Sequence, residues 1–290
     1  MTKTILISGA TGKTGAYTVP LLLDRGHAVR ALVHRIDARS ERLSAAGAEV
    51  VRGDLLDLAA VTNAMRGVNA AYFCYPIAQD LVEATGYFAF AAREAGVRAV
   101  VNMSQISARR DAGSNAARQH WISERIFDWS GVPTTHLRPT FFAEWLTMLA
   151  NTFQADGVMR LPFGEGRHAP IAATDQARVI AAVLDNPAPH TGQTYPLFGP
   201  MEMSHHEIAA EMARVLCRSI RYEPILVEAF AEFLRARGMS DHIIQHLSNV
   251  AVDYQNGIFA GTNDVVERIG GKPGTTVAAF VDQHRAAFSE

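Results

Sequence analysis

Residues 4–35 read TILISGATGKTGAYTVPLLLDRGHAVRALVHR, and this stretch decides the fold. A short apolar run at residues 5–7 leads into a glycine-rich turn. Apolar residues then recur at helical spacing from Val19 to Leu23, and a second apolar run covers residues 29–33. This succession of strand, turn, helix and strand has the length of one βαβ unit, so the sequence predicts a parallel sheet.

The turn carries three glycines in the spacing Gly9-x-x-Gly12-x-x-Gly15. Gly9 permits the tight bend, Gly12 lets the backbone approach a pyrophosphate, and Gly15 lets the helix pack close to the strand. The N-terminus of the helix then presents free N–H groups to a phosphate. In this context the pattern predicts a dinucleotide site; the alternative is a glycine-rich turn with no ligand.

The tip of the second strand, His34-Arg35, distinguishes between the two nicotinamide dinucleotides. An NAD site has Asp or Glu about 20 residues after the glycines, where it binds the ribose 2′-OH. A guanidinium at this point suits a 2′-phosphate instead, so we predict NADP(H). His34, Arg30 and Arg39 would add positive potential. In the alternative reading, Arg35 is a solvated charge and Asp37 binds the ribose.

The composition is that of a globular protein with a sizeable core. The chain has 290 residues, of which 48% are apolar and 19% charged, and its formal net charge is −2. This balance gives no electrostatic reason to expect a nucleic acid or a membrane as a partner. We expect no signal peptide and no transmembrane helix. Cys74 and Cys217 stand outside any CxxC motif, which favours free thiols and a reducing cytoplasm.

Strands and helices alternate through the first half of the chain, which predicts helices on both faces of a parallel sheet. We therefore expect an α/β Rossmann fold, a doubly wound sheet with the strand order 3-2-1-4-5-6. After Arg35, the predicted helices cover residues 40–46, 58–65, 79–94 and 116–130, and the predicted strands cover residues 49–51, 70–74, 99–103 and 134–137.

From Arg138 onward the alternation ends, and a smaller, mostly helical C-terminal lobe is expected to cap the carboxyl edge of the sheet. We predict an NADP-binding Rossmann domain over residues 1–155 and a substrate-binding, capping lobe over residues 156–290, packed around one cleft. The predicted helices of the second half cover residues 142–155, 174–186, 204–217, 226–237, 240–256 and 275–286, with short strands at 193–198 and 220–222.

Four segments in this order carry a family resemblance: the glycine turn Gly9–Gly15, Leu32–Arg35, Gly53–Leu55 and Leu137–Phe142. The chain resembles the NmrA-like family, an atypical branch of the short-chain dehydrogenase/reductase superfamily, over essentially its whole length. Members of that family include NADPH-sensing regulators, quinone oxidoreductases and triphenylmethane reductases. The resemblance implies the fold and the cofactor much more specifically than the reaction.

The resemblance also implies roles for individual residues. The turn from Thr11 to Gly15 would hold the pyrophosphate, Arg35 the 2′-phosphate, and Asp54 with Leu55 the adenine. Three residues, Cys74, Tyr75 and Pro76, would line the adenosine ribose and the path to the nicotinamide. Ser104 and the segment 139–142 would border the nicotinamide. Two alternatives remain open. Asp54 is only a turn residue, or the two phenylalanines are only core residues. The full implied cofactor set is Gly9, Thr11, Gly12, Lys13, Thr14, Gly15, His34, Arg35, Asp54, Leu55, Cys74, Tyr75, Pro76, Ser104, Pro139, Thr140, Phe141 and Phe142.

The usual catalytic pair of short-chain dehydrogenases, Tyr-x-x-x-Lys, is missing, since no tyrosine has a lysine four residues later. His120 and Glu124 occur where that pair is expected, and the i, i+4 spacing places them on one helix face. A neighbouring Glu would raise the imidazole pKa, so His120 is a candidate proton donor. Tyr75 is a second candidate. The alternative is that His120 and Glu124 form only a surface contact.

Quinones and conjugated cationic dyes accept hydride readily, so positioning against the nicotinamide would suffice for them. An aromatic and apolar group suits a flat acceptor of this kind, although packing between the lobes explains it equally well. Its members are Phe141, Phe142, Trp145, Met148 and Trp121.

Two histidine pairs have simpler explanations than a metal site. His242 and His246 are four residues apart in a helical pattern, but no Glu follows His242 and no third ligand is evident, so we predict no metal. His205 and His206 follow Ser204, a predicted N-cap, and helix-start chemistry explains them.

Two functions remain at this stage. The first is an NADPH-dependent oxidoreductase that reduces a small apolar acceptor, a quinone, conjugated carbonyl, imine or dye. The second is a regulator of the NmrA type that binds NADP(H) without turnover. The missing Tyr and Lys favour the second, and the nicotinamide-side segment with the extensive helical lobe favours the first. We expect no direct binding of nucleic acid; the oligomeric state stays open, a homodimer included.

Overall fold

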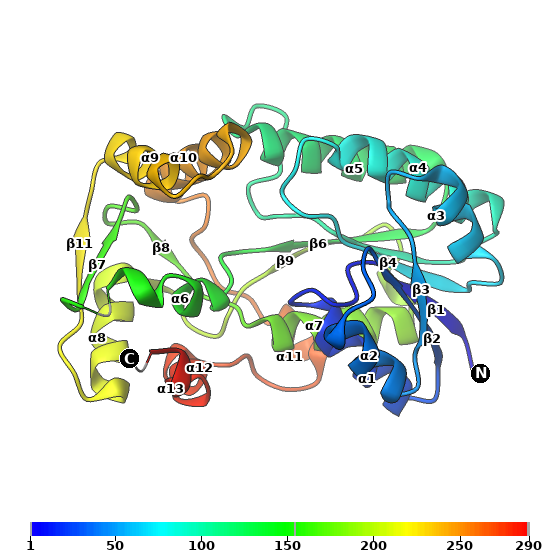
Figure 1. Cartoon of the computed structure of the whole chain (residues 1–290), viewed down its shortest axis with the longest axis horizontal. Coiled ribbons are helices and arrows are strands. Elements are labelled where there is room, and N and C mark those ends of the chain that lie inside the picture. The colour runs from blue at the N-terminus through cyan, green and yellow to red at the C-terminus, as the bar shows by residue number, and fades with distance from the viewer. Residues whose placement is uncertain (1, 154, 289–290) are drawn as a thin grey trace.

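The computed structural model describes residues 2–153 and 155–288 and contains a seven-stranded sheet at its centre (Figure 1). The strand order is β3-β2-β1-β4-β5-β6-β9, and every neighbouring pair is parallel. The predicted order of the first six strands is confirmed. The strands are β1 (Thr4–Ile7), β2 (Ala28–Val33), β3 (Glu49–Arg52), β4 (Ala70–Phe73), β5 (Val100–Met103), β6 (Thr134–Pro139) and β9 (Thr194–Leu197).

Helices cover both faces of the sheet because the strands are apolar on both sides. In β1, Ile5 and Ile7 face one buried cluster while Leu6, between them, faces the other. This is the period-two alternation of a strand buried on both faces. The first face is covered by α1 (Gly15–Asp24), α2 (Ala38–Ala45), α7 (Ala173–Asp185) and α11 (Val265–Gly270), and the second by α3 (Leu58–Met65), α4 (Leu81–Glu94) and α5 (Asn115–Ser130).

The sheet gains a strand and two helices from the second half of the chain. Strand β9 pairs with β6, and Ile171 and apolar residues of α7 and α11 contribute to the same buried cluster as Ile5 and Ile7. Residues from both sides of position 155 are thus present in this core and in the core of the C-terminal lobe. Sequence periodicity found strand 193–198 but carries no information on which sheet a late strand joins.

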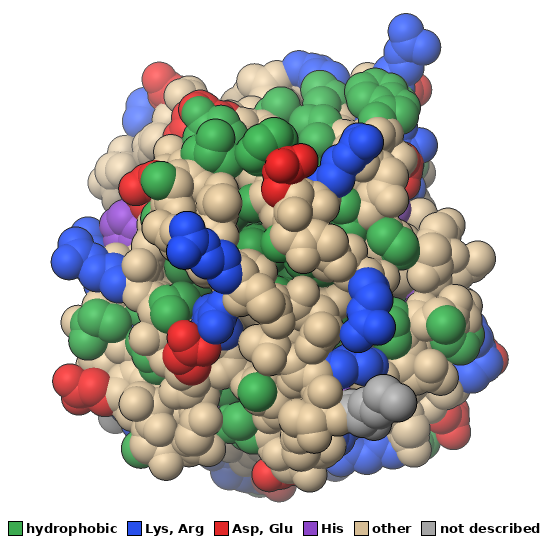
Figure 2. Space-filling model, turned by 90° about the vertical axis from the view of Figure 1, so that its right-hand side faces the viewer, with side chains coloured by type: hydrophobic (Ala, Val, Ile, Leu, Met, Phe, Trp, Pro, Cys, Tyr) green, Lys and Arg blue, Asp and Glu red, His purple; other side chains and the backbone are tan. Residues whose placement is uncertain are grey.

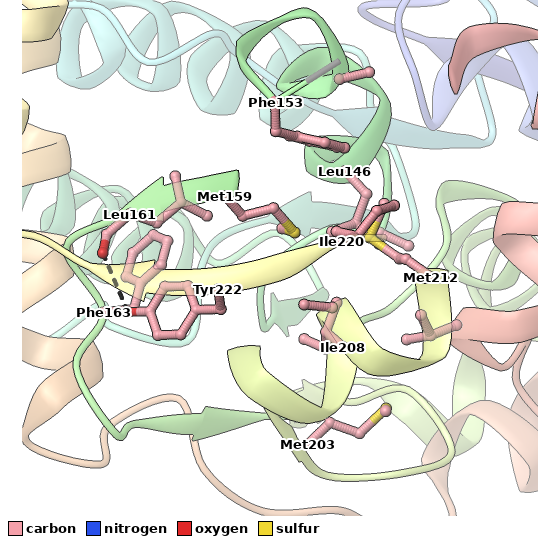
Figure 3. Packing of buried hydrophobic residues seen from close by; sticks show 14 of the residues in the cluster. Leu146, Phe153, Met159, Leu161, Phe163, Met203, Ile208, Met212, Ile220 and Tyr222 are labelled. Atoms are coloured by element: carbon pink, nitrogen blue, oxygen red, sulfur yellow. Dashed lines mark hydrogen bonds between the residues drawn. The ribbon is translucent and has the colours of Figure 1, made fainter. Parts of the chain in front are cut away.

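The C-terminal lobe has its own core, built on the parallel pair β7 (Val158–Leu161) and β11 (Arg221–Pro224). Figure 3 shows Tyr222 donating its hydroxyl proton to the carbonyl oxygen of Leu161 across this pair, at 3.1 Å. The other strands are β8 (Arg167–His168) and β10 (Met203–Ser204), and the helices are α6 (Glu144–Met148), η1 (Ala150–Thr152), η2 (Ala188–His190), α8 (His205–Leu216), α9 (Val227–Ala236), α10 (Asp241–Gln255), α12 (Val277–Gln283) and α13 (Arg285–Phe288).

The helix predicted over residues 142–155 is shorter than expected. It consists of α6 and the separate 3-10 turn η1, and strands β7, β8 and β10 were not predicted. Strands β8 and β10 have two residues each, which is too short to give a readable alternation of apolar and polar residues.

Polar contacts join the lobes through the loop that precedes α5. Arg109 binds Asp253 of α10 in a two-pronged ion pair at 2.6 and 2.8 Å. Ser114, the N-cap of α5, lies 2.8 Å from Nδ1 of His246. Gly113 packs so closely that a Cβ there would lie 2.4 Å from Oδ1 of Asn249. These contacts hold α10 against the Rossmann domain.

The surface is mixed in charge on the face near the N-terminus. Figure 2 shows Lys and Arg side chains interspersed with Asp and Glu on that face, and hydrophobic side chains gathered along its upper edge. This mixture agrees with the small net charge of the chain. None of the helices in the described part of the chain is both long and apolar enough to cross a membrane.

Substitution of Gly15 by Ala tests the close contact on which the glycine turn depends. A Cβ at Gly15 would lie 2.3 Å from the carbonyl oxygen of Gly9, so the helix would have to move away from the strand. We expect a loss of about 1–3 kcal/mol in the free energy of unfolding, measured by urea denaturation. Gly86→Ala is the control, because a Cβ in the interior of α4 meets nothing within 4 Å. This control should be stabilising by roughly 0.5–1 kcal/mol, and equal losses in both variants would contradict the prediction.

Candidate active site

The glycine turn forms a cradle between β1 and α1. Gly9 has φ of +60°, a conformation that favours glycine, and its carbonyl oxygen accepts a hydrogen bond from Gly12 N at 2.8 Å. Helix α1 begins at Gly15. The N–H groups of Ala16 and Tyr17 are bonded to the carbonyl oxygens of Gly12 and Thr14, whereas those of Lys13, Thr14 and Gly15 have no partner among the described residues and are available to a ligand. The hydroxyl of Thr14 lies 2.8 Å from that of the buried Tyr72, so this side chain serves the sheet and only its backbone remains for a phosphate.

A pocket of about 310 Å³ opens beside the turn, at the carboxyl ends of β1, β2 and β4. It brings together eight of the residues that the sequence assigned to the cofactor. It also includes four that were not assigned, Leu32, Val33, Gly53 and Leu56. The only sequence signal for these four residues is that they lie next to residues of the predicted motifs. The predicted residues that line it are Gly9, Thr11, His34, Asp54, Leu55, Cys74, Tyr75 and Pro76.

Asp54 and His34 face each other at the mouth of this pocket. His34 Nδ1 lies 3.5 Å from Asp54 Oδ2, and Asp54 Oδ1 accepts a hydrogen bond from Leu56 N at 2.9 Å. The carboxylate therefore shapes its own loop and also borders the pocket. Cys74 lies half-buried opposite Gly9, and burial raises the pKa of its thiol. A raised pKa keeps the sulfur protonated and unreactive at neutral pH.

The tip of β2 is followed by a guanidinium that is unpaired within the described ranges, Arg35, and by a carboxylate that is already engaged, Asp37. Asp37 caps α2 through Arg39 N and Ser40 N, and the Arg39 guanidinium beside it lowers the pKa of Asp37 to about 2. Its carboxylate oxygens are thus occupied, which argues against the alternative reading. Arg35 is exposed and has no hydrogen-bond or ion-pair partner among residues 2–153 and 155–288. Its guanidinium is free to bind an anion.

A second pocket, of about 290 Å³, adjoins the first at Thr11 and holds two further guanidinium groups. The sequence pointed to Arg39 and missed Arg42, which lies one helical turn further along α2. The residues that line this second pocket are Thr11, Ala16, Pro20, Arg39, Arg42, Leu43 and Ala46.

The predicted nicotinamide side lies at the ends of β5 and β6. Ser104 follows β5 and Pro139 ends β6, and both side chains are buried. The hydroxyl oxygen of Ser104 and the amide nitrogen of Gln105 are buried without a hydrogen-bond partner in the described part of the chain. Such orphaned polar groups are costly, and a ligand at this edge would satisfy them. Thr140 instead donates to the Phe259 carbonyl at 3.4 Å, which ties the β6 end to the C-terminal lobe.

The predicted pairing of His120 with Glu124 is wrong. Glu124 is fully buried and binds the guanidinium of Arg138 through both oxygens, at 2.6 and 2.8 Å. Burial, reinforced by the charge of His246, lowers the pKa of His120 to about 3 rather than raising it. The imidazole is therefore neutral at physiological pH and cannot serve as a cationic acid. The i, i+4 rule placed the two residues correctly on one face but could not foresee that Arg138 would take the carboxylate.

Tyr75 lines the first pocket, but its environment does not activate it. Burial, followed by the charges of Asp80, Asp54 and Glu83, raises the pKa of the Tyr75 hydroxyl. An acid needs a pKa closer to the working pH to give up its proton readily. The structure therefore supports a binding role for Tyr75 more than a catalytic one.

Glu144 is a buried carboxyl group that the sequence did not single out. Its Oε1 accepts the backbone N–H of Ala173 at the start of α7, 2.9 Å away, while Oε2 is buried with no partner in the described residues. Burial raises its pKa, and the charge of Lys13 acts in the opposite direction.

An enclosed aromatic cavity of about 30 Å³ lies in the C-terminal lobe, directly after the end of β6. Of the predicted aromatic group, Phe141, Phe142 and Trp145 line it, whereas Met148 is 51% exposed and Trp121 lies against Arg125. Phe141 packs at 5.3–6.0 Å from five other rings, so it is also part of the core. The full lining is Phe141, Phe142, Trp145, Leu146, Leu149, Leu161, Phe163, His168, Pro170, His205, Phe230 and Leu247.

Two imidazoles in this lining, His168 and His205, share a hydrogen-bond partner in Tyr254. The capping box between Ser204 and Glu207 is present, but it accounts only for the start of α8. His205 itself turns into the core, where it is 5% exposed. No local sequence signal joins residues 168, 205 and 254. Among the described residues, no group of three or more His, Cys, Asp or Glu side chains is arranged to hold a metal, and His246 is bound to Ser114.

Comparisons with known proteins agree with this geometry. A model of the NmrA-like family matches residues 1–268. The NAD(P)H azoreductase of Xenophilus azovorans is 31% identical over 284 residues, covering 98% of this chain and 99% of that protein. Quinone oxidoreductase 2 of Escherichia coli is 27% identical over 286 residues, covering 96% and 97%.

Solved structures show the same fold. The Escherichia coli NADPH-dependent quinone oxidoreductase in complex with NADPH superposes with a TM-score of 0.88 at 26% identity, covering 96% of this chain and 99% of that one. The triphenylmethane reductase of a Citrobacter species, in complex with NADP(H), gives 0.85 at 22% identity with the same coverage, which is a likeness of fold.

Arg35→Ala tests how the cofactor is selected. Loss of hydrogen bonds to a charged group costs about 1.5–3 kcal/mol, so NADPH binding should weaken about 10- to 100-fold while NADH binding stays unchanged. Titration calorimetry with both coenzymes measures this difference. Arg214→Ala is the control, because it removes an exposed guanidinium of α8 that lines neither pocket. Equal weakening of NADPH and NADH in the Arg35 variant would refute the 2′-phosphate role.

His120→Gln tests the neutral state of the buried imidazole. The folded-state pKa of about 3 lies below the ordinary value of 6.5, so the stabilisation that His120 provides is complete above pH 6.5 and is lost as the pH falls from 6.5 towards 3. As the pH falls from about 7 to about 5, the free energy of unfolding of wild type should decrease by up to about 2 kcal/mol more than that of the variant. Urea denaturation at each pH measures this difference. His34→Gln, at an exposed position, is the control. An unchanged pH slope in the His120 variant would contradict a depressed pKa.

Proposed function

The chain belongs to the NmrA-like family and is an NAD(P)H-dependent oxidoreductase, and on that premise we propose that it reduces a small apolar acceptor with NADPH. Acceptors of suitable chemistry are quinones, conjugated carbonyls, imines and dyes. The relatives are an azoreductase and a quinone oxidoreductase, both of which reduce conjugated acceptors. The observation that carries the proposal is the position of Phe141 and Phe142, which continue from the end of β6 into the lining of the aromatic cavity.

The residues of the chain fit NADP(H) in three places. The glycine cradle supplies backbone N–H groups for the pyrophosphate, the pocket at His34 and Asp54 receives the adenosine, and Arg35 is free for the 2′-phosphate. Ser104 and the Pro139–Phe142 segment would border the nicotinamide ring. When bound, NADPH supplies the hydride.

The aromatic cavity would hold the acceptor against that edge. Pockets for drug-sized ligands have volumes of about 300–1,000 Å³, so a cavity of about 30 Å³ must widen to admit a ring. Phe142, Trp145 and Leu149 line it and are only partly buried, so they are the side chains that can move outward. Binding of a flat acceptor between aromatic rings excludes water and sets the distance for hydride transfer.

A regulator that binds NADP(H) without turnover is the second candidate. The observation that favours it is helix α5, which lacks the Tyr-x-x-x-Lys pair and instead buries a neutral His120 and an ion-paired Glu124. Acceptors that take hydride without a strong acid reconcile this helix with catalysis, and for this reason we prefer the reductase.

The partners and the location that we propose follow from the exposed side chains, the net charge and the free cysteines. Phe90 on α4 and Ile122 and Trp129 on α5 are 53%, 37% and 76% exposed, and a homodimer would cover this adjoining pair of helices. With a net charge of −2, direct binding of nucleic acid is not expected. The free thiols of Cys74 and Cys217 suit a reducing cytoplasm.

Steady-state oxidation of NADPH in the presence of a panel of quinones, aldehydes and triphenylmethane dyes tests the proposed function. We expect sustained loss of NADPH absorbance with quinones or dyes, and little with simple aldehydes, which need a strong acid. Phe142→Ala should raise KM for these acceptors, because it removes one wall of the cavity. The absence of turnover with every acceptor, together with binding that distinguishes NADPH from NADP⁺, would overturn the reductase in favour of the regulator.

A further inference from the structure

Three buried polar side chains meet in the aromatic core of the C-terminal lobe. Tyr254 of α10 hydrogen-bonds through its hydroxyl to Nδ1 of His168, on β8, and to Nδ1 of His205, at the start of α8, the latter at 3.1 Å. All three residues are at most 5% exposed. Neither the cofactor pockets nor the capping of α8 requires this arrangement.

The packing around the three side chains fixes their positions. The ring of Phe163 stacks on His205 with centroids 4.7 Å apart and lies 4.6 Å from the ring of Tyr254. On another side, a Cβ at Gly166 would lie 2.4 Å from Cδ1 of Tyr254, so the loop passes directly against the phenol ring. The hydroxyl therefore cannot turn away from either imidazole without moving its ring.

The number of protons in the cluster constrains the two histidines. A phenol hydroxyl has one proton to donate and lone pairs to accept with. If it donates to one Nδ1, the other Nδ1 must carry a proton and donate to the phenol oxygen. The two imidazoles are consequently opposite tautomers: Nε2 carries a proton in one and is a bare acceptor in the other. Exchange of these roles takes four proton movements: two through the phenol of Tyr254, the loss of a proton at one Nε2 and the gain of a proton at the other Nε2.

The cluster is uncharged at neutral pH. Burial lowers the pKa of His168 well below its ordinary value, and burial together with the charge of His206 lowers the pKa of His205 to about 3. Burial raises the pKa of Tyr254. A neutral imidazole with a depressed pKa can still donate its N–H to a substrate carbonyl and polarise it.

Both imidazole rings line the aromatic cavity in which we place the acceptor. We propose that His168, Tyr254 and His205 form a neutral proton relay, which supplies the proton that a quinone or carbonyl acceptor takes up together with the hydride. The inference rests on the proposed function and adds to it a proton donor that never becomes charged, because each group of the hydrogen-bonded chain takes up one proton as it gives up another.

Each proton that leaves one group of the relay is replaced by a proton from the next group. The acceptor gains one hydride, and its oxygen takes the Nε2 proton of the first imidazole. Nδ1 of that imidazole takes the phenol proton, and the phenol oxygen takes the Nδ1 proton of the second imidazole. Nε2 of the second imidazole then takes a proton from water. The relay ends neutral with the two tautomers exchanged, and the acceptor has gained one hydride and one proton. After the product leaves, the reverse shift restores the starting tautomers: Nε2 of the first imidazole takes a proton from water that enters the cavity, and Nε2 of the second imidazole releases one to solvent.

The solvent side of the relay lies next to His205. His206 follows it in the chain, has a half-exposed side chain, and places its Nε2 3.5 Å from Oε1 of Glu165. The ring of Tyr222 lies between the two histidines, 5.3 Å from His205 and 4.9 Å from His206. Water at this surface can therefore return the proton close to the buried end of the chain.

Two acceptors separate proton delivery from hydride transfer. Reduction of 1,4-benzoquinone consumes a hydride and a proton, whereas reduction of a triphenylmethane dye cation consumes a hydride alone. Tyr254→Phe keeps the ring but breaks the relay, so kcat for the quinone should fall about 100-fold while reduction of the dye cation stays unchanged. Tyr222→Phe is the matched control, since it removes a hydroxyl that is bound to the Leu161 carbonyl in the same core. This control should reduce both acceptors at the wild-type rate.

A measurement without cofactor tests the relay independently. Nitrogen-15 NMR of the histidine side chains should show one of His168 and His205 protonated at Nδ1 and the other at Nε2 at pH 7, with exchange between the two forms, and this pairing should disappear in Tyr254→Phe. It applies to wild type even if the variant does not fold. Two identical tautomers, or a cationic imidazole in this pair, would overturn the relay.

The kinetic outcomes distinguish the two proposals. Suppose that wild type reduces both acceptors. If Tyr254→Phe then lowers kcat equally for the quinone and the dye cation, or lowers it for neither, the relay is overturned and the reductase stands. The same loss in Tyr222→Phe would also overturn the relay, because it would assign the effect to core packing. A wild-type protein that reduces neither acceptor would overturn the proposed function itself, and the relay with it.

Discussion

Helix α1 lies directly against the turn that follows β1, and the cofactor end of the fold depends on this contact. A Cβ at Gly15 would lie 2.3 Å from the Gly9 carbonyl oxygen, so only glycine lets the helix begin there. The N–H groups of Lys13, Thr14 and Gly15, unpaired in the part of the chain that the structure describes, then lie just after the carboxyl end of β1. The pocket beside the glycine turn, the free Arg35 and the ends of β5 and β6 all lie along the same carboxyl edge.

Much of this edge could be predicted from the sequence, because its signals are local. The three glycines and the tip of β2 each lie within one short segment, and the right-handed crossover rule gives the order of the first six strands. Eight predicted residues accordingly meet in one pocket. The seventh strand and the return of α7 and α11 to the sheet depend on tertiary packing, on which helical or strand periodicity carries no information.

The catalytic side was less predictable, because there the chemistry depends on partners far apart in the chain. Glu124 and His120 share a helix face, yet Arg138 takes the carboxylate and burial keeps the imidazole neutral. The His168, Tyr254 and His205 cluster joins three separate elements whose polar residues carry no common motif. Buried polar groups of this kind are settled by long-range packing, and for that reason the sequence pointed to helix α5 while the structure points to the aromatic cavity.

The central claim is that backbone amides after β1 and a guanidinium after β2 together bind a phosphorylated nicotinamide dinucleotide. Titration calorimetry of the purified wild-type protein with NADPH, NADP⁺ and NADH measures this most directly. The account predicts saturable binding of NADPH or NADP⁺ with one site per chain and a clearly weaker interaction with NADH. An absence of binding to both phosphorylated coenzymes would contradict it.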